Sequence, residues 1–351
     1  MKAISLFSSA GVGETYLKDI GIDVVVGAEL IKKRAELHKH LYPDSEVIIG
    51  DISKIETKER ISKFIKDDVK LLIATPPCQG VSSAGKNKNQ EQFLSDDRNF
   101  LIFDVFHFID NFDFDAVLIE NVSNFLKMYF PYEGELLLIS DLITKKYGSK
   151  YTIDVIDINA QDYGVPQSRP RCFIKMYKNN YVWASPKSEK QITLRDSIGH
   201  LPSLEAGETS SVKWHSANKA ADRDILAMKH TATGKSAMLN KVFYPKKING
   251  DKVKGFHNTY KRLSWDIPCL ARTTKSGEIS SHSNVHPGQL KEDGTYSDAR
   301  VLTILELLIV ASLPLEWDIP DWASDRFIRH AIGESVPPLL FKKVLETLKK
   351  K

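Results

Sequence analysis

The sequence predicts an α/β fold in which helices cover both faces of a parallel sheet, with a smaller, loop-rich domain attached. Over the first 178 residues, short β-branched apolar runs alternate with longer helical patterns. From about residue 186 to residue 258, this alternation gives way to Ser, Lys, Gly and Asn. We therefore expect one domain at 1–178, completed by a C-terminal helix at 328–351, and a second domain with a hinge at 179–327.

Each predicted strand is an apolar run bounded by turns or polar residues, and each predicted helix is a longer stretch with helical spacing. The strands are expected at Ala3–Phe7, Val24–Ala28, Val47–Ile49, Leu71–Ala74, Ala116–Ile119 and Ile153–Ile158. The helices between them are expected at Tyr16–Ile20, Lys32–Leu41, Lys58–Ile65, Phe100–Phe108 and Leu136–Lys146. Two further helices are expected at Val301–Leu313 and Val336–Leu348, the second with two prolines in its first turn, where proline is tolerated.

The composition excludes several classes of protein. With 42% hydrophobic and 27% charged residues, the chain is neither disordered nor fibrous. Cys78, Cys172 and Cys269 lie far apart and form no metal-binding spacing, which excludes a disulfide scaffold or a zinc finger. No apolar run reaches membrane-spanning length, and the N-terminus turns to Ser and Gly too early for a signal peptide. We expect a cytoplasmic protein that binds no metal and no membrane.

The charge is unevenly distributed along the chain. The formal net charge is +4, but residues 186–262 hold 15 Lys and Arg against 7 Asp and Glu, so that block carries +8 and the rest of the chain −4. A lysine-rich solvated surface would explain this block. A face that binds a polyanion would explain it equally well, because clustered cations neutralise phosphates and release counterions.

The first three predicted strands end in residues that suit a nucleotide-like ligand. The first runs into Phe7–Gly13, a turn of small residues that lets a ligand approach the backbone. The second ends at Glu29, whose carboxylate can bind ribose hydroxyls, and the third runs into Asp51 and Ile52. These strand ends predict a crevice for an adenosine-containing ligand, and they do not separate NAD from S-adenosylmethionine.

The next two strands end in a thiol and a carboxylate. Pro76 and Pro77 place Cys78 at the edge of the sheet, where it is a candidate nucleophile or an inert small hydrophobe. The following strand ends at Glu120, where partial desolvation would favour a general acid; a helix cap or an ion-pair partner is the plainer interpretation. A nucleophile beside a proton source is what addition to an electron-poor ring requires. Further on, Arg169 and Arg171 could hold a phosphate, a carbonyl oxygen or the carboxylate of Glu120.

Taken in order, these motifs resemble those of the cytosine-C5 DNA methyltransferase family, which includes bacterial modification enzymes. The matching segments are Phe7–Gly13, Pro76–Gln79, Glu120–Val122, Gln167–Arg171, Arg262–Pro268 and Ile332–Pro338. The resemblance spans nearly the whole chain. It implies a Rossmann-like S-adenosylmethionine-dependent methyltransferase domain and a smaller target-recognition domain, with the family's variable recognition region at 186–258.

The resemblance also implies a mechanism. Cys78 would attack C6 of a flipped-out cytosine, while Glu120 contacts N3 and the exocyclic amine. C5 would then take the methyl group of S-adenosylmethionine, leaving S-adenosylhomocysteine, and loss of the C5 proton with β-elimination would free the enzyme. Arg169 and Arg171 would hold the oxygen of the base and order the site. Flipping is needed because C6 cannot be reached inside a stacked duplex.

The same resemblance assigns binding residues and partners. Cofactor contacts are expected at Phe7, Ser9, Ala10, Gly11, Glu29, Leu30, Asp51, Ile52, Pro76, Leu101, Ser335 and Val336. DNA contacts are expected at Gln79, Ser82, Ser83, Lys86, Arg98 and Arg262, most of them in a loop at 79–99 that would close over the DNA. The plainer interpretations are a flexible linker for the loop and a structural role in the recognition domain for Arg262, with Ser264–Pro268. The expected partners are double-stranded DNA and a cognate restriction endonuclease that acts separately, and we expect a monomer that associates with the nucleoid through DNA.

Three residues depart from the family pattern. Ser9 stands where many relatives have glycine and should fit if its φ is negative. Leu30 replaces an aromatic residue, which would weaken stacking on adenine. Glu334 replaces an asparagine that makes domain-closing hydrogen bonds.

Three alternative functions remain at this point. They are a tRNA-modifying enzyme of the same family, a non-catalytic DNA-binding homologue, and a nicotinamide oxidoreductase. The pair of Cys78 and Glu120 argues against a binding module, which needs neither residue, and an oxidoreductase needs no Pro-Cys-Gln segment.

Overall fold

The computed structural model describes residues 1–77 and 93–351, and the chain divides into two compact units. The first unit comprises Met1–Asn159, Pro170–Lys187 and Pro338–Lys351, and the second comprises Ala160–Arg169 and Ser188–Pro337. These divisions differ from the boundary expected near residue 178. The reason is that Ala160–Arg169 already packs with the second unit, after which the chain returns to the first.

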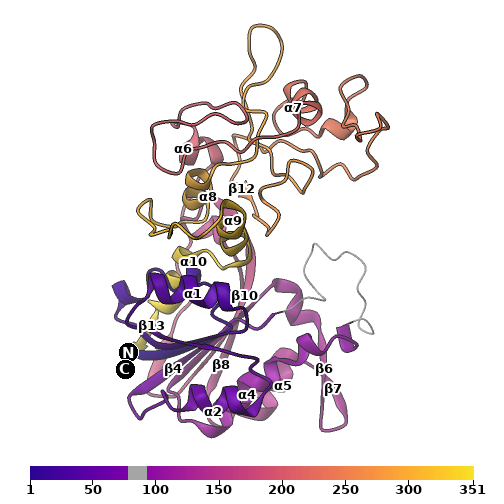
Figure 1. The fold of residues 1–351 in the computed structure, drawn as a ribbon. Helices are drawn as coiled ribbons and strands as arrows, with labels where there is room; N and C mark the ends of the chain where they lie inside the picture. The colour runs from indigo at the N-terminus through magenta and orange to yellow at the C-terminus, as the bar shows by residue number, and fades with distance from the viewer. Residues whose placement is uncertain (78–92) are drawn as a thin grey trace. The chain divides into compact units, whose positions relative to one another are not determined.

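A seven-stranded sheet forms the centre of the first unit (Figure 1). Its strands, in chain order, are β1 Lys2–Leu6, β2 Asp23–Glu29, β3 Glu46–Ile49, β4 Val69–Ala74, β5 Ala116–Asn121, β8 Thr152–Asn159 and β10 Pro170–Tyr177. Their spatial order is β3-β2-β1-β4-β5-β10-β8. All six predicted strands are present in this sheet, each within three residues of its expected ends.

The strand order creates one topological switch point. The strands from β3 to β5 pair in parallel, so their carboxyl ends meet at one edge of the sheet. The chain moves outward from β1 to β2 and β3, and then crosses to β4 and β5 on the other side of β1. Ligands of open α/β sheets bind at such a reversal, beyond the carboxyl ends of the strands. Here that position lies at the ends of β1 and β4.

Strand β10 was not predicted from the sequence, and it is antiparallel to both of its neighbours, β5 and β8. In its register with β5, Phe173 lies opposite Glu120 and Cys172 lies opposite Asn121. The sheet is therefore mostly parallel rather than wholly parallel. This antiparallel strand brings Arg171 to the carboxyl end of β5.

Helices cover both sides of the sheet. Figure 1 shows α1 (Lys32–Leu41) and α10 (Pro338–Leu345) on one side, and α2 (Ile55–Ser62), α4 (Ile102–Asn111) and α5 (Ile139–Tyr147) on the other. The prediction of an α-helix at Tyr16–Ile20 was wrong. Only a short 3-10 turn forms there, at Lys18–Ile20.

The helix predicted at Leu136–Lys146 begins late, at Ile139. The preceding residues form a hairpin of β6 (Tyr129–Tyr132) and β7 (Glu135–Leu138). Glu133 and Gly134 both have positive φ, 51° and 83°, which is the backbone of a tight hairpin turn. This turn and its aromatic flank favour a strand over the first part of the predicted helix.

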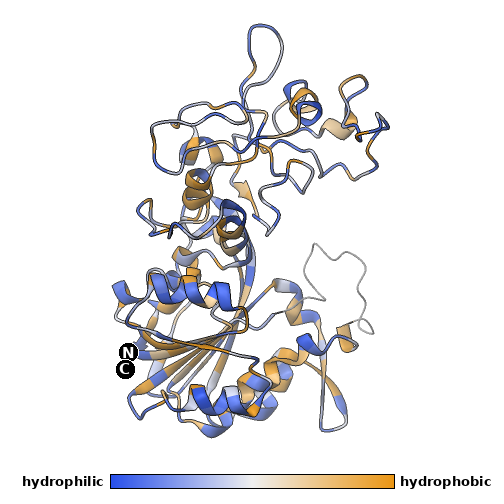
Figure 2. Cartoon of the chain, in the orientation of Figure 1, coloured by the Kyte–Doolittle hydropathy of each residue, from blue (hydrophilic) through white to orange (hydrophobic). Residues whose placement is uncertain are grey.

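The second unit consists largely of loops. Its elements are the bridge between β9 (Gln167–Ser168) and β12 (Cys269–Leu270), helices α6 Leu194–Ile198, α7 Asp222–Lys229, α8 Ile304–Val310 and α9 Asp325–Glu334, and 3-10 turns at Ala160–Tyr163 and Ala237–Leu239. Its largest fully buried side chains include four arginines, Arg262, Arg272, Arg300 and Arg329. Figure 2 shows hydrophobic strands in the first unit and mixed colouring along these loops. Buried ionic and hydrogen-bonded groups therefore supplement a small apolar core.

The single C-terminal helix expected at 328–351 is instead three elements. Helix α9 ends at Glu334, α10 begins at Pro338, and β13 (Leu348–Lys350) pairs with β11 (Tyr181–Trp183). Pro337 interrupts the helix because it offers no N–H to the preceding turn, whereas Pro338 begins the next helix. Among the described residues, every helix is too short or too polar to cross a bilayer.

Candidate active site

The carboxylate of Glu120 is buried at the end of β5 and paired with an arginine from β10. Glu120 is 6% exposed, and its Oε1 lies 2.8 Å from Nε of Arg171. Arg171 also donates from Nη1 to the carbonyl oxygen of Pro170, 2.7 Å away. Strand β5 is buried along its whole length, so the carboxylate needs a counter-charge and receives one. The structure thus unites two of the four predicted catalytic side chains, Glu120 and Arg171.

The residue after Glu120 ties this strand end to the segment before Cys78. Asn121 donates from Nδ2 to the carbonyl oxygen of Pro76, 3.0 Å away, and Val122 N–H donates to Asn121 Oδ1. Pro76 is buried at the end of β4. Cys78 itself lies outside the described residues. The chain that leads to it is held beside the Glu120 strand end.

The other two cysteines are unsuited to nucleophilic chemistry. Cys172 and Cys269 are each 1% exposed. Burial raises the pKa of both thiols, and for Cys172 the nearby carboxylate of Glu120 raises it further. A buried thiol with a raised pKa has little thiolate at neutral pH. Of the three cysteines, this leaves Cys78 as the candidate nucleophile.

The turn after β1 forms a cradle at the switch point. Phe7, Ser9 and Gly11 have positive φ values of 60°, 50° and 71°. Ser9 therefore does not meet the condition of negative φ under which it was expected to replace glycine without strain. Its backbone N–H donates to Oε2 of Glu29 at 3.1 Å, which accounts for the conformation. Glu29 is 7% exposed, and its Oε1 accepts from Ile31 N–H at 2.8 Å.

Two side chains of the α1 segment support this cradle, and the sequence analysis did not identify them. His38 is fully buried between Glu14 and Ser8, with Nε2 3.2 Å from Glu14 Oε2 and Nδ1 3.1 Å from Ser8 Oγ. Tyr42 donates its hydroxyl proton to the carbonyl oxygen of Gly11, 2.9 Å away. A Cβ on Gly11 would lie 2.6 Å from the Tyr42 ring, so the turn requires glycine there. The sequence signal was a pair of aromatic side chains four positions apart, His38 within the predicted helix and Tyr42 just beyond its end.

The remaining predicted cofactor contacts of the first unit lie around the same edge. The carboxylate of Asp51 accepts from the N–H and hydroxyl of Ser53, and these bonds lower its pKa. Leu30 is 64% exposed, and Ile49, which pairs with Glu29 across the strands, is 37% exposed. The other contacts range from fully buried to partly buried: Ala10, Ile52, Pro76, Leu101 and Phe7. An exposed apolar surface at the ends of β2 and β3 suits the flat face of an adenine.

Arg169, by contrast, belongs to the second unit. It is 5% exposed and donates to the carbonyl oxygens of Arg272 and Gly333, at 2.8 and 3.0 Å. Any Cβ on Gly333 would collide with the backbone of Thr273, so α9 packs directly on that segment. Arg169 therefore joins three backbone segments of its own unit, consistent with the ordering part of its predicted role.

Two other late-motif residues are placed in the second unit with Arg169. Ser335 caps the end of α9, where its hydroxyl donates to Ile332 O, and Val336 is 7% exposed. Glu334, which departs from the family pattern, places its Oε2 3.4 Å from Nδ1 of His330 on the same helix, which is an ion pair when the histidine is protonated.

The prediction that Arg262 contacts DNA does not agree with the structure. Arg262 is 0% exposed and donates to the carbonyl oxygens of Met228, His286 and Asp298. Burial lowers the pKa of this guanidinium to about 10. A side chain enclosed by backbone acceptors cannot reach a phosphate, so Arg262 stabilises the second unit instead.

The other predicted DNA contacts fall near or within the segment that is not described. Arg98 is exposed and forms a two-point ion pair with Asp96, at 2.9 and 2.8 Å. Four residues lie outside the described part of the chain: Gln79, Ser82, Ser83 and Lys86. In the basic block at 186–262, all Lys and Arg residues are exposed except Lys229, Lys261 and Arg262.

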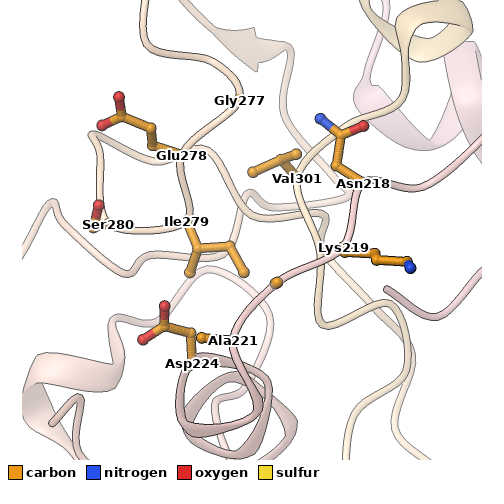
Figure 3. Close-up of a pocket in the computed structure, with 10 residues that line it drawn as sticks. Asn218, Lys219, Ala221, Asp224, Gly277, Glu278, Ile279, Ser280 and Val301 are labelled. Carbon is orange, nitrogen blue, oxygen red and sulfur yellow. The ribbon is translucent and has the colours of Figure 1, made fainter. Parts of the chain in front are cut away.

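A separate pocket lies in the second unit at the start of α7 (Figure 3). Its lining residues are Asn218, Lys219, Ala220, Ala221, Asp224, Gly277, Glu278, Ile279, Ser280 and Val301. Burial raises the pKa of Asp224, whose Oδ1 lies 4.0 Å from Arg223 Nε and has no hydrogen-bond partner among the described residues. None of the predicted site residues lines this pocket.

Comparisons with known proteins identify the family. The sequence model described as C-5 cytosine-specific DNA methylase matches residues 1–350. The type II methyltransferase M1.HgaI of Avibacterium volantium is 44% identical over 342 residues, covering 97% of this chain and 96% of that protein. M1.HphI of Haemophilus parahaemolyticus is 26% identical, covering 99% and 86%. The chain therefore belongs to the C-5 cytosine-specific DNA methylase family, and the resemblance seen in the sequence is confirmed.

Solved structures agree on the fold. A putative DNA modification methyltransferase from an Escherichia coli prophage superposes with a TM-score of 0.68 at 19% identity, over 99% of this chain and 98% of that one. A DNMT2 structure from Spodoptera frugiperda gives 0.66 at 16% identity, over 99% and 98%. The predicted α/β fold is thereby confirmed. Membership of the methylase family excludes the nicotinamide oxidoreductase.

Proposed function

We propose that this chain is a type II modification methyltransferase that transfers a methyl group from S-adenosylmethionine to C5 of a cytosine in a specific sequence of duplex DNA. One observation carries this proposal. The buried carboxylate of Glu120 is held by Arg171 at the strand end that also binds the carbonyl of Pro76, two residues before Cys78. The 44% identity to M1.HgaI supports the type II assignment.

The residues of the first unit fit the cofactor. Each oxygen of the Glu29 carboxylate accepts one backbone N–H, which leaves further lone pairs for ribose hydroxyls. The cradle at Phe7–Gly11 has no room for a Cβ at Gly11. Leu30 and Ile49 offer apolar surface for adenine. S-adenosylmethionine would supply an electrophilic methyl group at this edge, and S-adenosylhomocysteine is the product.

The reaction needs a nucleophile because C5 of cytosine is a weak carbon nucleophile. The Cys78 thiolate forms a bond to C6, and the electron pair of the C5–C6 double bond becomes available at C5. C5 then takes the methyl group. Transfer of the C5 proton to solvent water leaves its electron pair to re-form the double bond as the Cys78 thiolate leaves, so the enzyme is regenerated.

Glu120 and Arg171 act on the base during addition. A carboxyl group at N3 and the exocyclic amine neutralises the charge that develops in the ring when Cys78 adds. Arg171 fixes the rotamer of Glu120 and can donate to the oxygen at C2 of the base. Because both side chains lie on adjacent strands, this geometry is set before the substrate arrives.

The second unit would provide target recognition. Its exposed lysines suit DNA phosphates, and its loops would read the base edges. We include in the proposal the DNA contacts at Gln79, Ser82, Ser83, Lys86 and Arg98, a cytoplasmic location, monomeric action and a separate cognate endonuclease. Arg262 is not among these contacts.

The test is methyl transfer in a host and in a purified reaction. Bisulfite sequencing of a plasmid from a host that expresses the gene should reveal methylated cytosines at one short sequence. Purified protein should transfer label from S-adenosylmethionine to duplex DNA, and the Cys78→Ala variant should bind both ligands without transfer. Absence of transfer to any mixed-sequence duplex by a protein that binds the cofactor would refute the proposal. Transfer to tRNA but not to DNA would instead favour the tRNA-modifying alternative.

A further inference from the structure

The three most exposed large apolar side chains of the described residues lie within one stretch of the second unit. Ile248 is 90% exposed, Phe256 79% and Val242 70%. Side chains of this size bury themselves when they can, so a local concentration of exposed ones indicates a surface that meets a partner.

The same stretch is strongly basic. Between residues 241 and 256 there are five lysines, all exposed, and one acidic residue, Asp251. The carboxylate of Asp251 accepts from Nδ2 of Asn249 at 2.8 Å, within its own turn. The lysine ammonium groups thus set the charge that a partner meets, and they favour a polyanion.

Ile248 and three of the five lysines are displayed on an ordered hairpin, Pro245–Val253. Val253 N–H donates to Pro245 O at 2.9 Å, and Lys247 N–H donates to Asp251 O at 2.7 Å. Ile248 lies in the tip, which turns back at Gly250, with φ of 88°. The hairpin therefore presents Ile248 on a formed backbone, which lowers the entropic cost of binding.

Tyr244 holds two of the lysines beside the hairpin. The ammonium groups of Lys246 and Lys252, which pair across the two strands, lie 5.5 and 4.9 Å from the centroid of its ring. The aromatic face attracts both cations and keeps them near the base of the hairpin, with Ile248 beyond them.

We propose that the hairpin Pro245–Val253 enters the major groove of duplex DNA and that Ile248 recognises a base pair through the 5-methyl group of a thymine. The major groove admits a two-stranded ribbon, and the thymine methyl is the apolar group on its base edges. Lysines on both strands of the hairpin would contact the phosphates that flank the groove. This inference rests on the proposed function and names a specificity-determining residue for it.

A second hairpin of the same unit provides a matched control. Leu290, which pairs with Tyr296, is 64% exposed. Its neighbour Lys291 forms an ion pair with Glu205 at 2.9 Å, and the turn carries Glu292 and Asp293. This acidic turn would be repelled by phosphates. Leu290→Ala thus removes a comparable exposed apolar side chain from a surface that DNA would avoid.

The test compares kcat/KM of the wild type, Ile248→Ala and Leu290→Ala on duplexes that contain the methylated site. In a set of duplexes, each thymine of the site and its flanks is replaced in turn by deoxyuridine, which lacks the methyl group. One replacement should lower the wild-type value about four-fold, which is the worth of one buried carbon. Ile248→Ala should lose a similar factor on the thymine duplex and be insensitive to that replacement, while Leu290→Ala behaves as wild type.

Two results would overturn the inference. One is an Ile248→Ala variant with wild-type kcat/KM on every duplex. The other is an Ile248→Ala variant that stays as sensitive as wild type to every deoxyuridine replacement. Failure of the proposed function is distinguishable, because then the wild type transfers no methyl group to any duplex.

A binding measurement tests the lysines independently of catalysis. The double change Lys246→Gln and Lys247→Gln should weaken binding to all duplexes alike. It should also reduce the slope of log affinity against log salt by about two, one for each lost phosphate contact. An unchanged slope would place the hairpin away from DNA.

Discussion

Nε of Arg171 lies 2.8 Å from Oε1 of Glu120, and both side chains are largely buried between adjacent antiparallel strands. Removing one member of a buried ion pair is far more costly than the pair is stabilising, because the other charge is left uncompensated. The pair therefore keeps the strand end ordered and also positions the carboxylate that would act on the base.

Arg171→Ala should reduce methyl transfer by about 100-fold or more, which is the ~3 kcal/mol typical of removing one active-site donor that stabilises developing charge. Arg171→Lys keeps the charge but loses the planar guanidinium, so its rate of methyl transfer should lie between those of the wild type and Arg171→Ala. Cofactor affinity, measured by calorimetry, should stay near the wild-type value because Glu29 and the glycine turn are untouched. A wild-type rate for Arg171→Ala would show that the pair has no role in transfer.

Tyr42→Phe should weaken cofactor binding about five-fold, because the Gly11 carbonyl loses a hydrogen bond of about 1 kcal/mol that fixes the cradle. Tyr151→Phe is the matched control. Its hydroxyl donates to Phe114 O at the same 2.9 Å and is buried in the same unit, away from the turn. Both variants should lose similar thermal stability, and only Tyr42→Phe should change the dissociation constant. Equal affinities would mean that Tyr42 serves stability alone.

Ser9→Gly should raise the free energy of unfolding by up to about 1 kcal/mol. The φ of 50° at Ser9 is unfavourable for an L-residue and free of strain for glycine. Ser5→Gly, in the middle of β1, should have the opposite effect, because glycine in a strand costs conformational entropy. Urea unfolding of both variants checks the signs. A loss of stability in Ser9→Gly would show that its side chain outweighs the strain.

The sequence was sufficient for the strands and for the strand-end residues because these depend on local patterns. Apolar runs such as Leu71–Ala74 predict buried strands, and the parallel order then places Glu29 and Glu120 at one edge. The sequence was insufficient to predict β10, because charged residues interrupt the apolar run of Pro170–Tyr177. The orientation of β10 also depends on the preceding passage of the chain through the second unit.

The roles of two arginines show more clearly that contacts with distant parts of the chain cannot be predicted from local sequence. From the sequence, Arg171 is a cation available to a ligand, and Arg262 is either a structural residue or a phosphate contact. The acceptors that enclose Arg262 come from Met228, His286 and Asp298, at least 24 residues away in the chain. Burial by such distant segments has no local signature, so the motif predicts a phosphate contact where the fold encloses Arg262.

A buried ionic cluster should make the second unit sensitive to acid. His286 lies 3.6 Å from the carboxylates of Asp298 and Glu306, and Arg300 pairs with both carboxylates at 2.8 Å. Burial lowers the pKa of His286 to about 4. The geometry agrees with a neutral ring, because Gly288 N–H donates to its Nδ1.

The direction of the pH effect follows from these shifts. Between about pH 6.5 and pH 4 the unfolded chain binds a proton at His286 and the folded chain does not, so stability falls as the pH falls. The expected loss is about 3 kcal/mol by pH 4. The pKa values of Asp298 and Glu306 are lowered by the neighbouring His286 and Arg300 despite burial, so their contribution is lost below that range.

His286→Gln should therefore flatten the pH dependence of unfolding between pH 4 and pH 6.5. The glutamine oxygen can still accept from Gly288 N–H, which preserves the turn. The measurement is urea unfolding of the full chain at intervals across this range, with the exposed His257→Gln variant as the control. The control should keep the wild-type slope, because His257 is exposed and takes no part in the buried cluster. If His286→Gln keeps that slope too, the acid sensitivity comes from other groups.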